Sequence, residues 1–307
     1  MNYAVIVELL SASIRIATPL LLVALGGVIS ESGGTFAVGV EGMMLGGAFG
    51  GAVTVLVTKN VFLGLLASTL AGALLATIIA VATVRFRTDH MVTGLAVNIF
   101  ALGLTSFLLR GLFGGKTPVM VLPTLGSVRI PWLWSLPFAG PILFDEPLMS
   151  YLAFLLVIPV HLFLRRTRAG LTLRAVGENP SAAFSVGANP ETIRMAAVIL
   201  CGTFAGLGGA VLSLQELGTF TDGMTNGRGF LALAAIIVGR WMPFRVMGGC
   251  LLIGAASALA LNIQGWGLPV SSYVIQMTPY LIALAVLCGI GRKARMPASI
   301  GKAFIRS

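Results

Sequence analysis

Residues 62–84 read FLGLLASTLAGALLATIIAVATV, an apolar run that contains no charged side chain. Because an α-helix rises about 1.5 Å per residue, this run is long enough to cross the ~30 Å hydrocarbon core of a bilayer. A helix also satisfies its backbone hydrogen bonds internally, as lipid requires. Arg85 and Arg87 follow directly. The stretch therefore predicts a transmembrane helix that ends at a membrane surface.

The same pattern recurs along the whole chain, which has 307 residues, of which 57% are hydrophobic and 10% charged. A soluble domain carries about 25% charged residues, so too few are present to cover a water-facing surface. We predict an all-α fold, a polytopic transmembrane helical bundle of about eight to ten spans within a single domain, residues 1–307. The predicted spans are residues 9–29, 37–57, 62–84, 91–113, 148–164, 192–215, 229–240, 246–263 and 271–290.

The seventh predicted span, residues 229–240, is too short to cross a bilayer as a helix. It follows a polar, glycine-containing stretch from Gly218 to Arg228. Irregular backbone at membrane depth is tolerated where it faces protein or a water-filled cavity. This region therefore predicts a broken or re-entrant helix.

Most of the basic residues that give the chain a net charge of +10 lie between the predicted spans or at their ends. Of the 20, 14 form four groups, in residues 85–87, 165–194, 240–245 and the tail, residues 291–307, and an even number of spans separates each group from the next. The positive-inside rule places all four groups, and hence the C-terminus, in the cytoplasm. The N-terminus is then outside, although Arg15 is unusual within the first span. No basic stripe alternates with aromatic residues, so nucleic acid is not an expected partner.

The longest non-cytoplasmic segment, residues 114–147, is rich in Pro, Gly and Trp. It could rest on the membrane surface and meet an external partner. Alternatively, it is an interfacial loop in which Trp132 and Trp134 anchor at the lipid headgroups.

The sequence contains no complete motif for catalysis or cofactor binding. The run RGLFGGKT (residues 110–117) resembles a phosphate-binding loop, but Arg110 stands where glycine is required and no strand precedes it. Cys201, Cys250 and Cys288 lie in apolar runs and share no short spacing that predicts a metal site or disulfide. Paired carboxylates are not evident. We expect no catalytic residue, no metal and no cofactor on this chain, which is therefore predicted not to be an enzyme.

The segment 165–194 contains the most informative polar stretch, TRAGLTLRAVGENPSAAFSVGANPETIR (residues 167–194). Pro180 suits a first helical position, Glu178 or Asn179 can cap the preceding N–H groups, and Gly187 can end the helix. Asn189 and Pro190 then start the sixth span. Two successive caps predict a rigid short helix at the membrane surface.

Three stretches carry a family resemblance: residues 26–51 (GGVISESGGTFAVGVEGMMLGGAFGG), 170–190 (GLTLRAVGENPSAAFSVGANP) and 227–243 (GRGFLALAAIIVGRWMP). They resemble permeases of the branched-chain amino acid, ribose and nucleoside class of ATP-binding-cassette (ABC) importers. Among the subfamilies, nucleoside permeases are most similar and simple-sugar permeases come next. The resemblance covers nearly the whole chain.

This resemblance implies a membrane-spanning permease subunit in the bacterial plasma membrane, embedded in lipid. It also implies a separate ATPase that holds ATP and magnesium, a second permease subunit that is identical or related, and an external substrate-binding protein. The family's coupling helix, which docks on the ATPase, is matched by Arg174, Gly177, Glu178, Asn179, Pro180 and Ala182. Two positions depart from the family: Phe184 stands where a basic residue is frequent, and Ser32 ends a Ser-Glu-Ser run where Ser-Glu-Arg is frequent.

Ionisable and amide side chains at membrane depth are candidates for the substrate path. Glu41, in a glycine-rich stretch, either contacts substrate or caps backbone N–H groups, and the sequence does not favour one. Glu31 is interpreted as a cytoplasmic boundary charge. Asn98 is expected to form a hydrogen bond between helices, with a polar ligand as the alternative partner.

Two further groups complete the candidates. The residues between spans six and seven could line an outer gate or form a solvated loop; they are Gln215, Thr221, Asp222, Asn226 and Arg228. Phe100 and Phe230 could stack on a base or sugar, although aromatic residues that face lipid or core are commoner.

A second function class remains open, namely a secondary transporter driven by protons or sodium without an ATPase partner. Such proteins carry membrane-buried acids for the coupling ion, and Glu41 is the sequence's one candidate for that role. A membrane-embedded enzyme is a third class, which would turn over its substrate without translocation.

Overall fold

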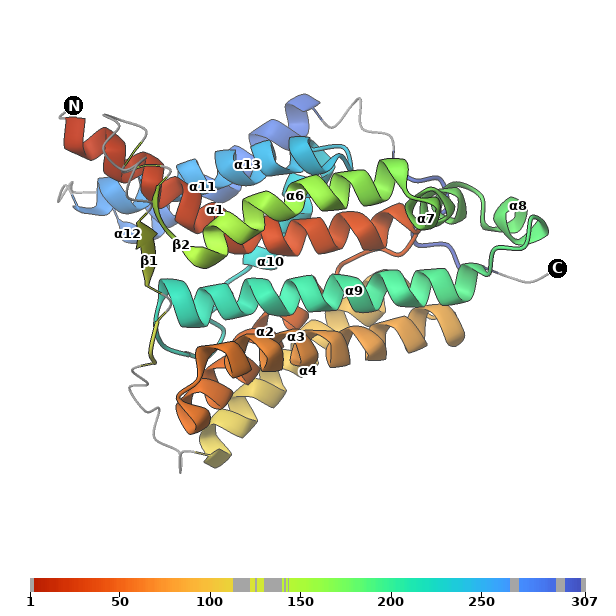
Figure 1. Ribbon diagram of the computed structural model, residues 1–307, viewed down its shortest axis with the longest axis horizontal. Coiled ribbons are helices and arrows are strands. Elements are labelled where there is room, and N and C mark those ends of the chain that lie inside the picture. The colour runs from red at the N-terminus through yellow and green to blue at the C-terminus, as the bar shows by residue number, and fades with distance from the viewer. Residues whose placement is uncertain are drawn as a thin grey trace.

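The computed structural model describes residues 3–112, 122–124, 126–129, 140, 142, 144–265, 271–290 and 296–304. Within these residues the chain is a bundle of helices with one short two-stranded ladder (Figure 1). The elements are α1 (Tyr3–Ser32), α2 (Val40–Thr58), α3 (Val61–Ala80), η1 (Val81–Arg85), α4 (His90–Leu112), β1 (Ser127–Arg129), β2 (Asp145–Pro147), α6 (Leu148–Arg166), α7 (Arg168–Glu178), α8 (Pro180–Ser185), α9 (Pro190–Val211), η2 (Leu212–Glu216), α10 (Arg228–Val238), α11 (Pro243–Gly265), α12 (Ser272–Gln276) and α13 (Thr278–Ile290).

In the described part of the chain, seven helical segments are long and apolar enough to cross a membrane. They correspond to predicted spans one to six and eight, and the first helix is longer than the predicted residues 9–29. Two apolar helices, α10 and α13, are shorter. The ninth predicted span, residues 271–290, is not one helix: it is divided between α12 and α13, because Pro279 has no N–H group with which to continue the helix.

The basic groups between the spans gather at one end of the bundle, as the charge pattern predicted. We call this the α8 end, because α7, α8 and residues 296–304 lie there (Figure 1). Arg85 lies 4.0 Å from Glu191 at this end, and Arg165 and Arg240 line one cavity. The described start of the chain, at Tyr3, lies at the opposite end from its last described residues, 296–304, in agreement with the predicted topology.

Arg15, the unusual charge in the first span, has its partners at the end opposite α8. Its Nε atom lies 3.1 Å from Glu146 Oε2, and its Nη2 atom donates to Ser11 Oγ. Glu146 belongs to β2, which pairs antiparallel with β1. Burial raises the pKa of the Glu146 carboxyl, and the bonds from Ser11 and Arg15 oppose that shift. Most of the predicted surface segment 114–147, including Trp132 and Trp134, lies outside the described residues.

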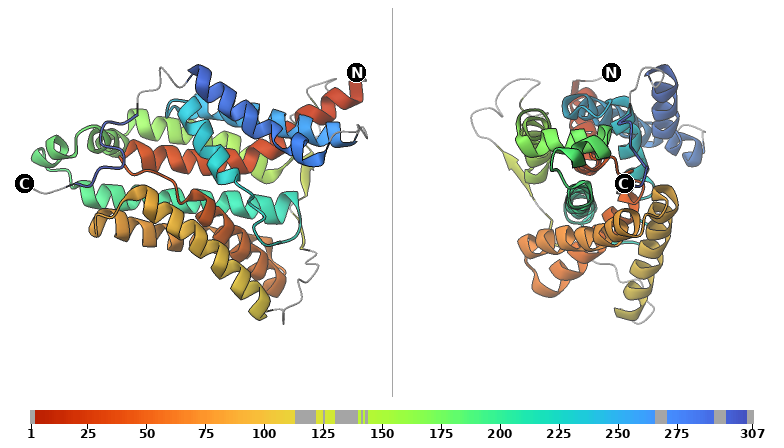
Figure 2. Two further views of the ribbon diagram at one scale, coloured as in Figure 1. Left: turned by 180° about the vertical axis from the view of Figure 1, so that it is seen from behind. Right: turned by 90° about the vertical axis from the view of Figure 1, so that its right-hand side faces the viewer.

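Glycines allow α2, α3 and α9 to pack backbone against backbone. A Cβ atom on Gly47 would overlap Gly206, and one on Gly206 would overlap the carbonyl group of Ser68. Small residues at such positions let membrane helices approach closely and gain dispersion contacts along their length. These three helices therefore form a close-packed layer beside α1 (Figure 2).

The break predicted before the seventh span is present. After η2, a π-helical turn at the end of α9, residues 217–227 form bends and turns, with Gly218, Gly223 and Gly227 at positive φ. The chain then enters α10, which packs against α1, α2, α11 and α13. Its 11 residues span about 16 Å, so α10 begins roughly half a bilayer thickness from the α8 end.

We predict that Gly206→Ala lowers the free energy of unfolding by about 1–3 kcal/mol, because the added methyl group forces α3 and α9 apart. Gly103→Ala is the matched control, since a Cβ atom at that helical position meets nothing within 4 Å. The thermal unfolding midpoint of the detergent-solubilised protein measures the difference. Equal midpoints for the two variants would contradict the close-packed layer.

Candidate functional site

The start of α10 is bound by a carboxylate from the first turn of α2. Glu41 Oε1 accepts a hydrogen bond from the Gly227 N–H at 2.8 Å, and Oε2 accepts from the Gly229 N–H at 2.7 Å. These amides have no partner within α10, and the helix dipole favours a negative charge beside them. The geometry therefore shows Glu41 as a cap for backbone N–H groups, one of its two interpretations. Contact between Glu41 and substrate stays a prediction.

Asn98 joins the same region from α4. Its Oδ1 atom accepts from the Gly42 N–H at 2.8 Å, and its Nδ2 atom donates to the Val38 carbonyl at 2.9 Å. The hydrogen bond between helices that we expected for Asn98 is therefore present. We call Glu41, Gly42, Asn98, Gly227 and Gly229 the mid-membrane hub, because they join α2, α4 and α10 where α10 begins.

The two aromatic candidates flank this hub in sequence and are open to the outside of the monomer. Phe100, two residues after Asn98, is 50% exposed, and Phe230, one residue after Gly229, is 42% exposed. Both rings are thus available to lipid, to a second subunit or to a passing substrate. Stacking of either ring on a substrate stays a prediction.

The remaining polar candidates are not gathered into one site. Gln215 is directed to α6, where its Nε2 atom lies 3.4 Å from Ser150 Oγ. Thr221 and Asn226 are exposed on the connection before α10. The carbonyl of Asn226 accepts a hydrogen bond of 2.7 Å from Tyr280 on α13. The structure therefore brings Glu41 and Asn98 together. Asn226 borders the hub, because its peptide bond to Gly227 carries the N–H that donates to Glu41, whereas no hydrogen bond joins Gln215 or Thr221 to the hub among the described residues.

An ion pair that the sequence reading missed closes the connection between α9 and α10. Arg228 Nη1 lies 3.0 Å from Glu216 Oε2, and both side chains are largely buried. The signal available in the sequence was one acid and one base that flank the same glycine-containing stretch. The pair fixes the two ends of residues 217–227 to each other.

Glu31 was interpreted as a cytoplasmic boundary charge. It lies in the last turn of α1, at the boundary of the first span, but its side chain is only 1% exposed. The cytoplasmic side of that boundary stays a prediction. Its Oε2 atom accepts a 2.6 Å hydrogen bond from the indole N–H of Trp241. Trp241 and Arg240 both have left-handed backbone (φ 55° and 51°) in the turn between α10 and α11. The bond joins α1 to a turn whose backbone conformation L-residues rarely adopt.

The predicted short helix in the polar segment is α8. Asn179 provides its cap, since its Oδ1 atom accepts from the Ala182 N–H at 3.0 Å, and Gly187 ends the helix region with φ +91°. Asn189 caps α9 in the same way: its Oδ1 atom accepts a hydrogen bond from the backbone N–H of Glu191 at 3.1 Å. The helix protrudes beyond the ends of α6 and α9 (Figures 1 and 2). Its tip carries exposed side chains, namely Ser181, Ala182, Ser185 and Val186.

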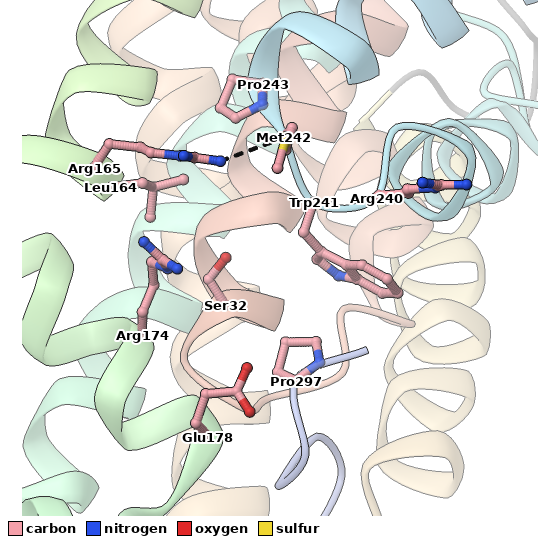
Figure 3. A pocket seen from close by; sticks show the side chains of 10 residues that line it. All are labelled: Ser32, Leu164, Arg165, Arg174, Glu178, Arg240, Trp241, Met242, Pro243 and Pro297. Atoms are coloured by element: carbon pink, nitrogen blue, oxygen red, sulfur yellow. Dashed lines mark hydrogen bonds between the residues drawn. The ribbon is translucent and has the colours of Figure 1, made fainter. Parts of the chain in front are cut away.

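Four residues assigned by resemblance to the coupling helix lie outside α8: Arg174, Gly177 and Glu178 belong to α7, and Asn179 is the N-cap between the two helices. Gly177 is in α7, and a Cβ atom there would overlap the Ser32 carbonyl at the end of α1. Arg174, also in α7, lines a cavity of about 140 Å³ (Figure 3). Gly177 therefore serves packing between α7 and α1 and cannot present a docking side chain.

The cavity at Arg174 is cationic. Arg165 contributes a second guanidinium group and Glu178 the one carboxylate among the lining residues, whereas the Arg240 side chain extends away from them (Figure 3). Arg165 Nη2 has Met242 Sδ as a weak acceptor at 3.5 Å. Such a set of charges suits an anionic group at the α8 end.

Comparisons with known proteins place this arrangement in context. Residues 9–288 match the family model described as branched-chain amino acid transport system / permease component. The chain is 37% identical to the nucleoside ABC transporter permease protein NupC of Lactococcus lactis, with 100% of both chains covered. It is 36% identical to the guanosine ABC transporter permease protein NupQ of Bacillus subtilis, with 98% of each covered. A putative glucose ABC transporter permease of Haloferax volcanii is 35% identical, over 91% of this chain and 90% of that one.

We predict that Glu41→Ala lowers the free energy of unfolding by about 1–3 kcal/mol for each amide of α10 that is left without an acceptor. Glu41→Gln, which keeps one amide oxygen as an acceptor, is expected to lose less. Glu8→Ala, at an exposed position of α1, is the control. Thermal unfolding of the solubilised protein gives the order of the three variants, and equal losses for Glu41→Ala and Glu8→Ala would refute the capping role.

Proposed function

Because the chain belongs to the family of branched-chain amino acid transport system permease components, we propose that it imports nucleosides as the permease subunit of an ATP-driven transporter. It is a multi-pass membrane protein and a transport component rather than an enzyme. In this proposal the membrane is the bacterial plasma membrane, and the α8 end and C-terminus face the cytoplasm, where the positive-inside rule places the basic groups.

The observation that carries the nucleoside assignment is similarity over the full length of the chain. A nucleoside permease and a guanosine permease match this chain from end to end, at 37% and 36% identity. A simple sugar is the second candidate substrate, favoured by the match to a putative glucose permease at 35% identity. Nucleosides and simple sugars both carry a hydroxylated sugar ring, so one path can suit both classes.

We assign ATPase docking to α8. Caps at both ends hold this helix rigid, and its exposed tip protrudes from the bundle, as a lever that fits a groove on another subunit requires. Arg165, Arg174 and Glu178 lie behind it in the cationic cavity. ATP and magnesium belong to the docked ATPase in this assignment, and closure of two ATPases displaces α8.

The substrate path is proposed to lie between this chain and a second permease, identical or related, with an external binding protein at the end opposite α8. The open rings of Phe100 and Phe230 supply faces on which a base or sugar can stack. Asn98 and Glu41 lie next to them in sequence but use their polar atoms within the hub. A path lined mostly by apolar surface binds substrate weakly, which suits a permease that receives its substrate from a high-affinity binding protein.

The ion-coupled alternative has less support from the geometry. It requires a membrane-buried acid that is free to exchange a proton or sodium ion. Glu31, Glu41 and Glu216 each accept hydrogen bonds from protein donors, namely Trp241, two α10 amides and Arg228. Glu31 and Glu41 thus use both carboxylate oxygens within the protein. Glu216 uses Oε2 for Arg228, and its buried Oε1 atom has no hydrogen-bond partner among the described residues.

We predict that Val186→Asp abolishes co-purification of the ATPase subunit and ATP-dependent uptake of guanosine, because a charge replaces the apolar tip at the end of α8. Val186 is 84% exposed, so insertion and folding of the permease should be unchanged. Lys59→Asp is the control, since it places the same carboxylate at an exposed position outside the spans, in the connection between α2 and α3. Uptake of labelled guanosine into proteoliposomes that contain the complete transporter measures the effect.

Competition with unlabelled glucose in the same assay separates the two candidate substrates. Inhibition by inosine and guanosine but not by glucose would support the nucleoside assignment. Guanosine uptake by liposomes that contain the permease without any ATPase would refute the ATP-driven mechanism in favour of ion coupling.

A further inference from the structure

The described part of the C-terminal tail, residues 296–304, is bound to the end of α7 immediately before α8. The Ser299 N–H donates to the Gly177 carbonyl at 3.0 Å. The Ser299 hydroxyl lies within hydrogen-bonding distance of the same carbonyl and of the Val176 carbonyl. Ser299 is 5% exposed, so these bonds lie within the protein. The tail therefore holds the residues from which α8 projects.

Arg194 of α9 binds the tail from the other side. The positive-inside pattern counted it as a surface charge, but it is 2% exposed. Its Nη2 atom donates to Ser299 Oγ at 2.9 Å and its Nη1 atom to the Lys302 carbonyl at 2.8 Å. Its Nε atom donates to the Gly33 carbonyl at 3.1 Å. One guanidinium thus joins α9, the tail and the connection between α1 and α2.

The tail also touches that connection directly. The Gly301 N–H donates to the Gly34 carbonyl at 3.0 Å. Gly34 has φ +91°, and a Cβ atom there would lie 2.7 Å from Arg194 Nη2, so glycine is required for both reasons. Residues 33–39 lead from here to Val40 and Glu41, the start of α2 and of the mid-membrane hub.

The last contact reaches α8 itself. Phe304 is 9% exposed, and its ring centroid lies 5.7 Å from that of Phe184 in α8, in a tilted arrangement. Aromatic pairs with this spacing stabilise a contact by more than the burial of their apolar area alone accounts for. This contact also gives Phe184 a role at the position where the family often has a basic residue.

We propose that residues 296–304 form a tie that positions α8 and transmits its displacement to the connection between α1 and α2, and so to the mid-membrane hub. The proposal rests on α8 being the ATPase-docking element. Ser299, Arg194 and Phe304 are its positioning residues. They lie inside the permease, so they act through α8 and the connection and need no contact with ATP or substrate.

The test is Phe304→Ala in the complete transporter, assembled in liposomes with its ATPase and the guanosine-loaded binding protein. The ATPase is expected to remain bound, because the exposed tip of α8 is unchanged. The amount of guanosine imported per ATP hydrolysed should fall about fivefold. That is the size of the change in the equilibrium between the bound and released tail that is expected when one aromatic pair is lost. Hydrogen exchange of α8 amides in the solubilised permease should rise by a similar factor.

Phe304→Tyr should restore both readouts, because it keeps the ring. Phe86→Ala is the matched control: Phe86 is 73% exposed in the connection between η1 and α4, at the same end of the bundle. An unchanged ratio of guanosine to ATP in Phe304→Ala would overturn the proposal, and so would loss of the bound ATPase. If the unsubstituted chain shows no ATP-dependent uptake, the proposed function fails instead, and hydrogen exchange alone decides whether the tail holds α8.

Discussion

The free backbone amides at the start of α10 are the constraint on which the interior of this protein depends. A helix that begins about halfway through a bilayer cannot leave its first N–H groups to water, and lipid offers no acceptor. Glu41 supplies both acceptors from α2, at 2.7–2.8 Å. The break between α9 and α10 creates this terminus, and Asn98 of α4 bonds to the residue next to Glu41 in the first turn of α2.

The rigid helices around this terminus determine how a movement at the α8 end can reach it. Close packing of α2, α3 and α9 through Gly47 and Gly206 leaves little room for these helices to slide independently. The connection between α1 and α2 is the non-helical route from the α8 end to Glu41. This connection is hydrogen-bonded to Arg194 of α9 and to Gly301 of the tail. The tail also contacts α8, so the same segment is linked to the docking helix at one side and leads to the hub at the other.

The charges at membrane depth illustrate why part of the site escaped the sequence reading. Arg15 looked unusual within its span and Glu31 was interpreted as a cytoplasmic boundary charge, whereas each is bonded to a side chain from a distant segment. For Arg15 this distant partner is Glu146, and for Glu31 it is Trp241, both more than a hundred residues away in the chain. The local sequence shows that a charged side chain lies in an apolar run, where burial costs free energy. It does not show which distant segment supplies the hydrogen-bonding partner.

By itself, the sequence determined the membrane-spanning helices, the common side of the basic segments, the break before α10 and the capped helix at Pro180. These features depend on the length of an apolar run, or on a cap within three or four residues, so they are properties of local segments. Only the tertiary structure decided that Glu41 caps α10, that α13 is separated from α12, and that the tail binds the end of α7 and the side of α8. Those outcomes depend on which helices become neighbours, because a buried polar group takes whichever partner the packed bundle brings within hydrogen-bonding distance.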